Sequence, residues 1–165
     1  MTGTRYSKAP IAEAVIDIQV RYFEALSPSA LSEFVKICKP QVATRCAVRY
    51  INRIAMPMPK FDAQRVFNIY PTVPEGIQQD LAGLFMQLQM PQSDLDDKSA
   101  AVVNVAFDSS AWIEAPTIIL DFDIFKAEEI EPTSDDVRKT LERFRIGKNE
   151  LFEACITDET GTLIR

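Results

Sequence analysis

Hydrophobic and polar residues alternate along five segments of this chain, and alternation with a period of two is the pattern of a half-buried strand. The five predicted strands are Ala14–Val20, Thr44–Ile54, Leu81–Met90, Ala101–Phe107 and Thr117–Phe125. Thr44–Ile54 has the longest clean alternation, so we take it as the central strand of the fold. Its expected buried face carries Cys46, Val48, Tyr50 and Ile54.

Three other segments show helical spacing of apolar residues or helix-capping signals. They are Ser27–Cys38, Asp62 to about Tyr70, and a long helix from Thr133 or Ser134 to Cys155. In the first, Ser27 is a favourable N-cap and Pro28 suits the first helical turn. In the last, Gly147 interrupts the pattern and marks a position where a kink is expected.

The order of these elements predicts the fold class. It reads β-α-β-α-β-β-β-α, and the last three strands follow one another with short loops, which favours antiparallel pairing. Polar outer faces on the strands indicate that helices cover only one side of the sheet. We therefore predict a single α+β domain over residues 1–165, with a mainly antiparallel sheet of about five strands and helices packed on one face.

Composition removes several classes of function. The chain has 165 residues, 47% hydrophobic and 25% charged, which allows one domain to bury a core. Its net charge of −6 argues against general nucleic-acid binding. It has no histidine, which excludes histidine acid–base catalysis, hydrolases that depend on a histidine base, and zinc sites with a histidine ligand.

The cysteines and the glycines give no sign of a catalytic or cofactor site. Cys38, Cys46 and Cys155 are widely spaced in apolar stretches, so we interpret them as core residues rather than as a disulfide framework or reactive thiols. No glycine-rich phosphate loop is present, and we expect no cofactor. Met1–Pro10 is polar and no stretch has the length of a membrane span, so we expect a cytoplasmic protein that does not enter a membrane.

Arginines repeat at every fourth position of the central strand. Arg45, Arg49 and Arg53 should therefore stand in a line on its outward face, with Asn52 and Tyr50 near their rim. Arginine binds carboxylates and phosphates through paired donors. The row is a candidate anion site, for example for a nucleotide or a phosphorylated small molecule.

Asp121 and Asp123 share the outward face of a later strand and allow two other interpretations. As partners of the arginines they would form a ladder of salt bridges on a solvated face. As a pair of carboxylates they are weak candidates for a Mg²⁺ site, which Glu13 and Asp17 would join if the first strand lay beside them. Two carboxylates are a weak signal, so we predict no metal site.

Five segments also carry a resemblance to a known family. They are Pro10–Ile18, Arg45–Ile54, Phe85–Gln89, Ile118–Asp123 and Lys148–Asp158. In residues and in order they resemble the blocks of a sporadically distributed family of uncharacterised bacterial and archaeal proteins. The resemblance implies the fold of that family and a cytoplasmic location, and it implies no activity.

The chain is similar to an internally shortened member of that family. Val35–Pro40 runs almost directly into the central strand, at a point where the family holds a block of strands. Loss of strands exposes a sheet edge or an apolar helix face. We therefore expect self-association or a protein partner, at the unpaired side of the central strand. The alternative is a compact variant whose sheet closes without the missing strands.

Two functional hypotheses follow from these features. The first is a cytoplasmic binding or interaction protein without enzymatic activity, which acts through a protein partner or through self-association. The alternative is an anion- or nucleotide-binding domain, conceivably a metal-dependent phosphohydrolase, that uses the arginine row with Asp121 and Asp123. Arginines paired on a flat face would count against the alternative, and arginines lining a concave pocket would favour it.

Overall fold

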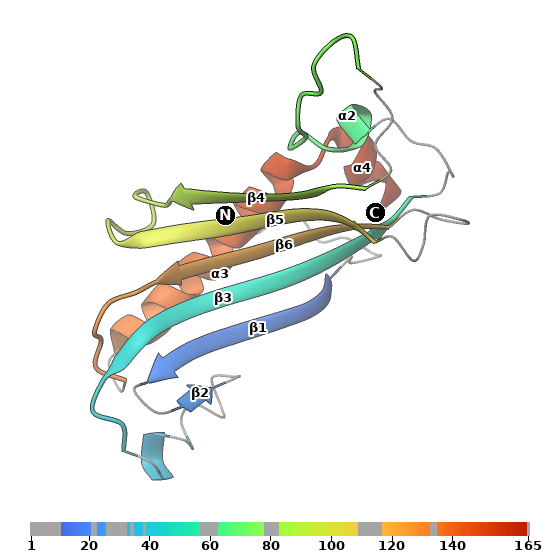
Figure 1. The fold of residues 1–165 in the computed structure, drawn as a ribbon. Coiled ribbons are helices and arrows are strands. Elements are labelled where there is room, and N and C mark those ends of the chain that lie inside the picture. Colours follow the sequence, from blue (N-terminus) through green and yellow to red (C-terminus); the bar gives the residue numbers. More distant parts are fainter. Residues whose placement is uncertain are drawn as a thin grey trace.

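The computed structural model describes residues 11–20, 23–25, 33, 35–37, 39–56, 63–77, 83–108, 117–132 and 135–164. Its helices and strands are β1 Ile11–Val20, β2 Phe23–Ala25, β3 Ala43–Ala55, α2 Ala63–Val66, β4 Phe85–Pro91, β5 Ser99–Asp108, β6 Thr117–Lys126, α3 Asp135–Cys155 and α4 Asp158–Leu163. The described strands form one sheet in the order β2-β1-β3-β6-β5-β4, and all neighbours pair antiparallel (Figure 1). The predicted α+β class with an antiparallel sheet is confirmed.

The predicted order of elements and the predicted number of strands are wrong. Strand β2 follows β1 where no strand was expected, and α4 follows α3, so the described order is β-β-β-α-β-β-β-α-α. The described sheet has six strands rather than about five. Among the residues whose side chains are described, β3, β6, β5 and β4 contribute to the core. Strand β2 has three residues, which is too short to show an alternation pattern.

The central strand β3 is paired on both sides. Strand β1 pairs along one edge, from Val20 opposite Ala43 to Ile11 opposite Asn52, and β6 pairs along the other. The expectation of an unpaired side at this strand is therefore wrong, and the ends of the described sheet are β2 and β4. The predicted helix Ser27–Cys38 lies largely outside the described residues. Within this range the structure describes only residues 33 and 35–37, and all of them are helical.

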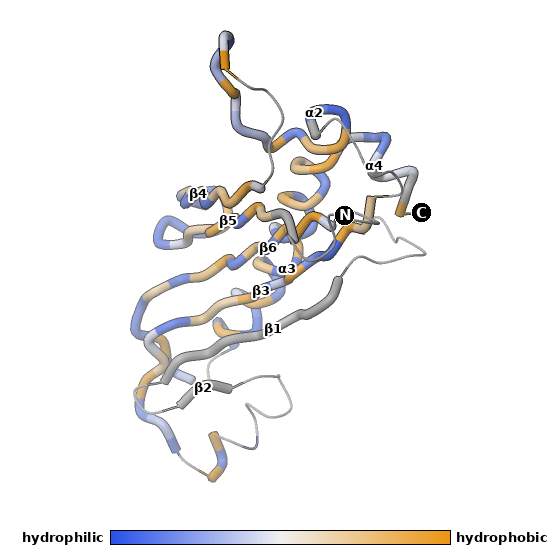
Figure 2. Tube along the Cα trace, turned by 45° about the vertical axis from the view of Figure 1, so that its right-hand side comes forward, coloured by the Kyte–Doolittle hydropathy of each residue, from blue (hydrophilic) through white to orange (hydrophobic). Residues whose placement is uncertain are grey.

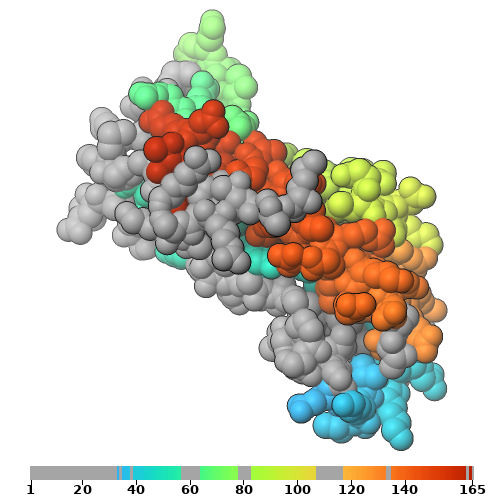
Figure 3. Space-filling view, turned by 180° about the vertical axis from the view of Figure 1, so that it is seen from behind, coloured from blue at the N-terminus to red at the C-terminus, as the bar shows by residue number. Residues whose placement is uncertain are grey.

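Helix α3 covers one face of the sheet. It passes behind β3 and β6 in Figure 1, and Figures 2 and 3 show it along that side of the strands. No helix among the described residues covers the other face, which we call the open face. Its side chains come from Arg45, Ala47, Arg49, Ile51 and Arg53 of β3, Ile119, Asp121, Asp123 and Phe125 of β6, Ala100, Val102, Asn104 and Ala106 of β5, and Phe85, Gln87 and Gln89 of β4.

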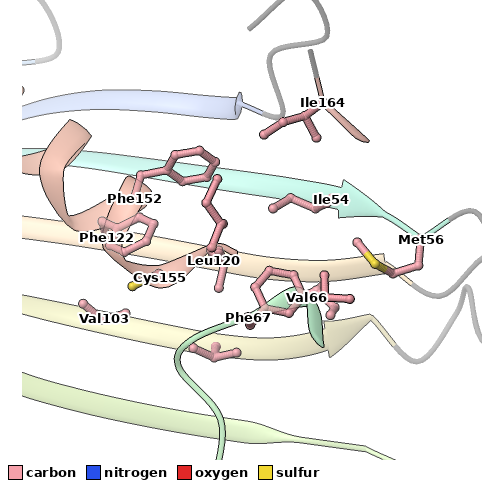
Figure 4. Packing of buried hydrophobic residues seen from close by; sticks show 13 residues of the cluster. Ile54, Met56, Val66, Phe67, Val103, Leu120, Phe122, Phe152, Cys155 and Ile164 are labelled. Atoms are coloured by element: carbon pink, nitrogen blue, oxygen red, sulfur yellow. The ribbon is translucent and has the colours of Figure 1, made fainter. Parts of the chain in front are cut away.

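The core lies between α3 and the sheet. Phe122 of β6 is fully buried, and its ring meets that of Phe152 of α3 edge to face, with centroids 6.3 Å apart (Figure 4). Nearer the N-terminus of α3, Phe144 is also fully buried and packs with Val48 and Ile124. The apolar stripe predicted for this helix is therefore the surface that holds it on the sheet.

Helix α3 is continuous through Gly147, as the prediction of one long helix requires. A Cβ atom on Gly147 would lie 2.6 Å from Cδ1 of Leu95, which belongs to the loop between β4 and β5. The glycine thus permits close packing of that loop on the helix, and no kink is needed to explain it.

The predicted helix from Asp62 to about Tyr70 has a single described turn, Ala63–Val66, because Phe67 leaves it to bridge Ile156. The next residue, Asn68, closes the end of α3: its backbone N–H donates to the Cys155 carbonyl at 2.9 Å, and its Nδ2 donates to the Ile156 carbonyl at 2.8 Å. These bonds satisfy carbonyls that a helix C-terminus leaves open. None of the described helices is both long enough and apolar enough to cross a membrane.

Candidate functional site

Among the residues whose side chains are described, two ion pairs lie on the open face, and the first joins Arg49 to Asp121. Arg49 donates from Nε to Oδ1 at 2.9 Å and from Nη2 to Oδ2 at 2.8 Å, which is the two-pronged geometry that an arginine fork makes with a carboxylate. The side chain of Asp121 is 8% exposed and that of Arg49 is 46% exposed. Arg49 therefore pairs with a buried carboxylate and separates it from solvent.

The second ion pair joins Arg45 to Asp123. Nη2 of Arg45 donates to Oδ1 at 3.0 Å and to Oδ2 at 2.8 Å. To reach Asp123 the arginine crosses Phe125, and its Cζ lies 4.8 Å from the centre of that ring, within the range of a cation–π contact. Burial raises the pKa of the Asp123 carboxyl, and the charge of Arg45 opposes that rise.

The Arg49–Asp121 pair belongs to a hydrogen-bonded network that crosses four strands. Nδ2 of Asn104 on β5 donates to Oδ2 of Asp121 at 3.0 Å. Nε2 of Gln87 on β4 donates to Oδ1 of Asn104 at 2.8 Å. The chain of bonds thus runs from β3 through β6 and β5 to the terminal strand β4. The sequence did not reveal Asn104 and Gln87, because a register between strands has no local signal.

The other members of the predicted anion site are arranged differently. Asn52 lies on the helix side of β3, where it is 2% exposed and donates from Nδ2 to the Leu120 carbonyl at 3.0 Å. The Tyr50 side chain also lies on the helix side of β3, where its ring contacts Lys148. Arg53 is exposed and stands opposite Ile119. Arg45 and Arg49 therefore have the carboxylate partners of the salt-bridge interpretation.

The two aspartates considered as weak metal candidates, Asp121 and Asp123, form ion pairs with arginines. Asp121 and Asp123 each bind one guanidinium. Strand β3 lies between β6 and β1, and the backbone positions of Glu13 and Asp17 are opposite Ile51 and Ala47, so a strand separates them from Asp121 and Asp123. Over the described part of the chain, no group of three or more acidic or cysteine side chains is placed to hold a metal ion.

Lys148 lies at a core-facing position of α3 and is a buried cation. It is 7% exposed, and its Nζ lies 4.0 Å from the centre of the Tyr50 ring. Burial is the main cause that lowers the pKa of the Lys148 ammonium, and nearby Arg145 adds to the effect. The aromatic face compensates part of the cost of burying this charge.

A second charged cluster lies where the β4–β5 loop meets the end of β6. Nζ of Lys126 binds Asp96 at 3.0 Å and Glu128 at 2.7 Å, and Glu128 also pairs with Lys98. The pKa of Asp96 is lowered, first by the backbone N–H of Lys98 and then by Lys126. An open hollow of about 1450 Å³ adjoins the cluster and is lined by both acidic and basic residues, many of them paired, so it offers no single charge to a ligand.

The described cysteines lie in the core. Cys46 and Cys155 are buried, and Cys38 lies outside the described residues. Burial raises the pKa of the Cys155 thiol to about 11, whereas a reactive cysteine has a lowered pKa. The interpretation of Cys46 and Cys155 as small hydrophobic core residues is confirmed.

The Cys155 thiol predicts a dependence of stability on alkaline pH. An unfolded chain loses this proton near pH 9.0 and the folded chain near pH 11, so stability should fall as the pH rises between them. The slope should be about 1.4 kcal/mol per pH unit. Urea unfolding of the wild type and of Cys155→Ala, repeated across this range, should show a shallower slope for the variant. Equal slopes would contradict the prediction.

No family model, curated protein or solved structure matches this chain. The resemblance to the sporadically distributed bacterial and archaeal family therefore stays a prediction that rests on the segments quoted above.

Proposed function

We propose that this chain is a binding or interaction protein that acts through the terminal strand of its sheet, either on a protein partner or on a second copy. A cytoplasmic location belongs to the same proposal and rests on the family resemblance. Strand β4 carries the observation behind it. Among its residues Phe85 is 72% exposed and Leu88 is 37% exposed, and the seven residues Phe85–Pro91 include no charge.

Sheet edges of this kind invite pairing with another chain. A terminal strand presents backbone N–H and C=O groups to solvent, and natural proteins protect such edges with charges, prolines or bulges. Strand β4 has a proline at its last position, Pro91, and an apolar and amide surface elsewhere. An extended segment of a partner would therefore gain backbone hydrogen bonds and bury Phe85 and Leu88.

The alternative, an anion- or nucleotide-binding domain, has no comparable observation in its favour. Arg45 and Arg49 lie on a sheet face and already bind Asp123 and Asp121. A phosphate at this place would replace a carboxylate that has two donors in fixed geometry. The described geometry thus supports an interaction through β4 more directly than a ligand site at the arginine row.

A capture experiment with a β4 variant tests the proposed function. The baits are the wild type, the double variant Phe85→Lys/Leu88→Lys, and Ile37→Lys as a control at an isoleucine that is 80% exposed and lies outside β4. We expect the wild type and the control either to self-associate in light scattering or to capture the same protein from the native host, and the β4 variant to do neither. Identical behaviour of all three baits would overturn the proposal.

A further inference from the structure

Strand β4 reads nearly the same in both directions. Its central residues are Met86-Gln87-Leu88-Gln89-Met90, which are symmetric about Leu88. Two copies of such a strand, laid antiparallel across a two-fold axis at Leu88, place each residue opposite one of the same type. A sequence with this symmetry suits pairing with itself, whereas a different partner would not require it.

This pairing needs backbone N–H and C=O groups of β4 that point away from β5, and the hydrogen-bond pattern between the two strands shows which residues have them. The N–H of Gln92 donates to the carbonyl of Ser99 at 2.8 Å, so this opposite pair is hydrogen-bonded. In an antiparallel ladder hydrogen-bonded pairs alternate with non-hydrogen-bonded ones. Residues 90, 88 and 86 therefore bond to β5, and the backbone groups of Gln87 and Gln89 point away from β5. Figure 1 shows that β4 is the last strand on that side of the sheet.

These directions agree with an axis at Leu88. Gln87 of one copy would face Gln89 of the other, and both have their backbone donors and acceptors on the outer edge. Leu88 would face its own copy as a non-hydrogen-bonded pair, in which side chains approach most closely. Such a pairing leaves the β4–β5 ladder unchanged, because it uses only groups that β5 does not use.

The side chains agree with the same register. Leu88 lies opposite Val103, and Met86 and Met90 lie opposite Val105 and Ala101, on the helix side where both methionines pack against the core. Pairing would continue this apolar surface across the axis. On the open face Gln87 donates from Nε2 to Asn104, which leaves its Oε1 to accept from Gln89 of the other copy. The strand has no charge, so no like charges meet at the axis.

From these observations we infer that β4 is a homodimer interface, in which a second copy of this chain pairs antiparallel about Leu88 and continues the sheet. The inference rests on the proposed function and names its partner. It commits to one register, with Leu88 against Leu88 and Gln87 against Gln89, and that register gives the experiments their controls.

Charges placed at the axis test the interface. Light scattering and sedimentation should give the wild type and Ile37→Lys twice the chain mass of 18.6 kDa at high concentration. Leu88→Lys and Leu88→Glu, each alone, should raise the dissociation constant at least about tenfold, because two like charges then face each other. An equimolar mixture of the two variants should form a dimer again, and circular dichroism should show both folded as the wild type. This rescue occurs only where residue 88 meets residue 88.

Cysteine cross-linking tests the register. Under mild oxidation Leu88→Cys should link to itself, because directly opposite residues lie within disulfide range. Gln87→Cys should link poorly to itself and well to Gln89→Cys in a mixture. A monomeric wild type, or a dimer that Leu88→Lys does not weaken, would overturn the inference. If β4-dependent capture of another protein persists in that case, the proposed function stands and only the homodimer is lost; without such capture both fail.

Discussion

Replacement of Phe122 with alanine should lower the free energy of unfolding by about 3–5 kcal/mol, the cost of removing a large aromatic side chain from a packed core. Phe122 is fully buried on β6, in the middle of the sheet, and its ring packs edge to face on Phe152 of α3. The variant would lose both the buried apolar area and the contact that joins the helix layer to the sheet. Urea unfolding followed by far-UV circular dichroism measures the change.

Phe85→Ala is the matched control for this substitution. Phe85 is 72% exposed on the terminal strand, so the same change of side chain should alter the free energy of unfolding by less than about 0.5 kcal/mol. Both variants should be measured at one low protein concentration, so that association does not contribute. A loss of similar size in the two variants would contradict the view that the Phe122–Phe152 contact holds the layers together.

The sequence predicts most clearly the elements whose pattern is long and local. The central strand was expected at Thr44–Ile54 and is observed at Ala43–Ala55. The long helix was expected to bury a stripe from Val137 to Cys155, and α3 spans both residues. The turn expected at Asp158–Gly161 is wrong, because these residues belong to α4. In the central strand and the long helix, many residues repeat the same period, so a single exception does not disturb the pattern. Strand β2 has three residues and α2 has four, and neither can carry such a repeat.

The order of the strands in the sheet could not be predicted from the sequence. Strand β3 was expected to have an unpaired side, but it lies between β1 and β6, and β6 begins more than sixty residues later in the sequence. Pairing over that distance depends on which edges remain open when the sheet assembles, which a local pattern does not record. The terminal strands of the described sheet are β2 and β4, and neither is the strand for which the open edge was predicted.

The candidate site shows the same division between local and long-range information. A period of two correctly placed Arg45 and Arg49 on one face, with Asp121 and Asp123 as partners. The same period assigns Asn52 to the opposite face, and the structure has it there. Asn52 therefore does not belong to the arginine row.

Arg49→Ala should lower the free energy of unfolding by about 1.5–3 kcal/mol, the usual range for hydrogen bonds to a charged group. The substitution removes both bonds from Arg49 to Asp121 and leaves a carboxylate whose side chain is only 8% exposed. Asn104 remains as a donor but carries no charge. Arg65→Ala is the matched control, because its partner Glu159 is 46% exposed, and we expect a loss below about 1 kcal/mol there.

A double-mutant cycle separates the cost of the stranded carboxylate from the loss of arginine packing. In an Asp121→Asn background, residue 121 has no charge to leave unpaired, so Arg49→Ala should then cost less than about 1 kcal/mol. The difference between the two backgrounds is the coupling between Arg49 and Asp121, and urea unfolding of the four proteins gives it directly. If Arg49→Ala costs the same in both backgrounds, or costs no more than Arg65→Ala, the arginine does not neutralise the buried Asp121. In that case the arginine row would be open to an added anion, and the anion-binding alternative would regain support.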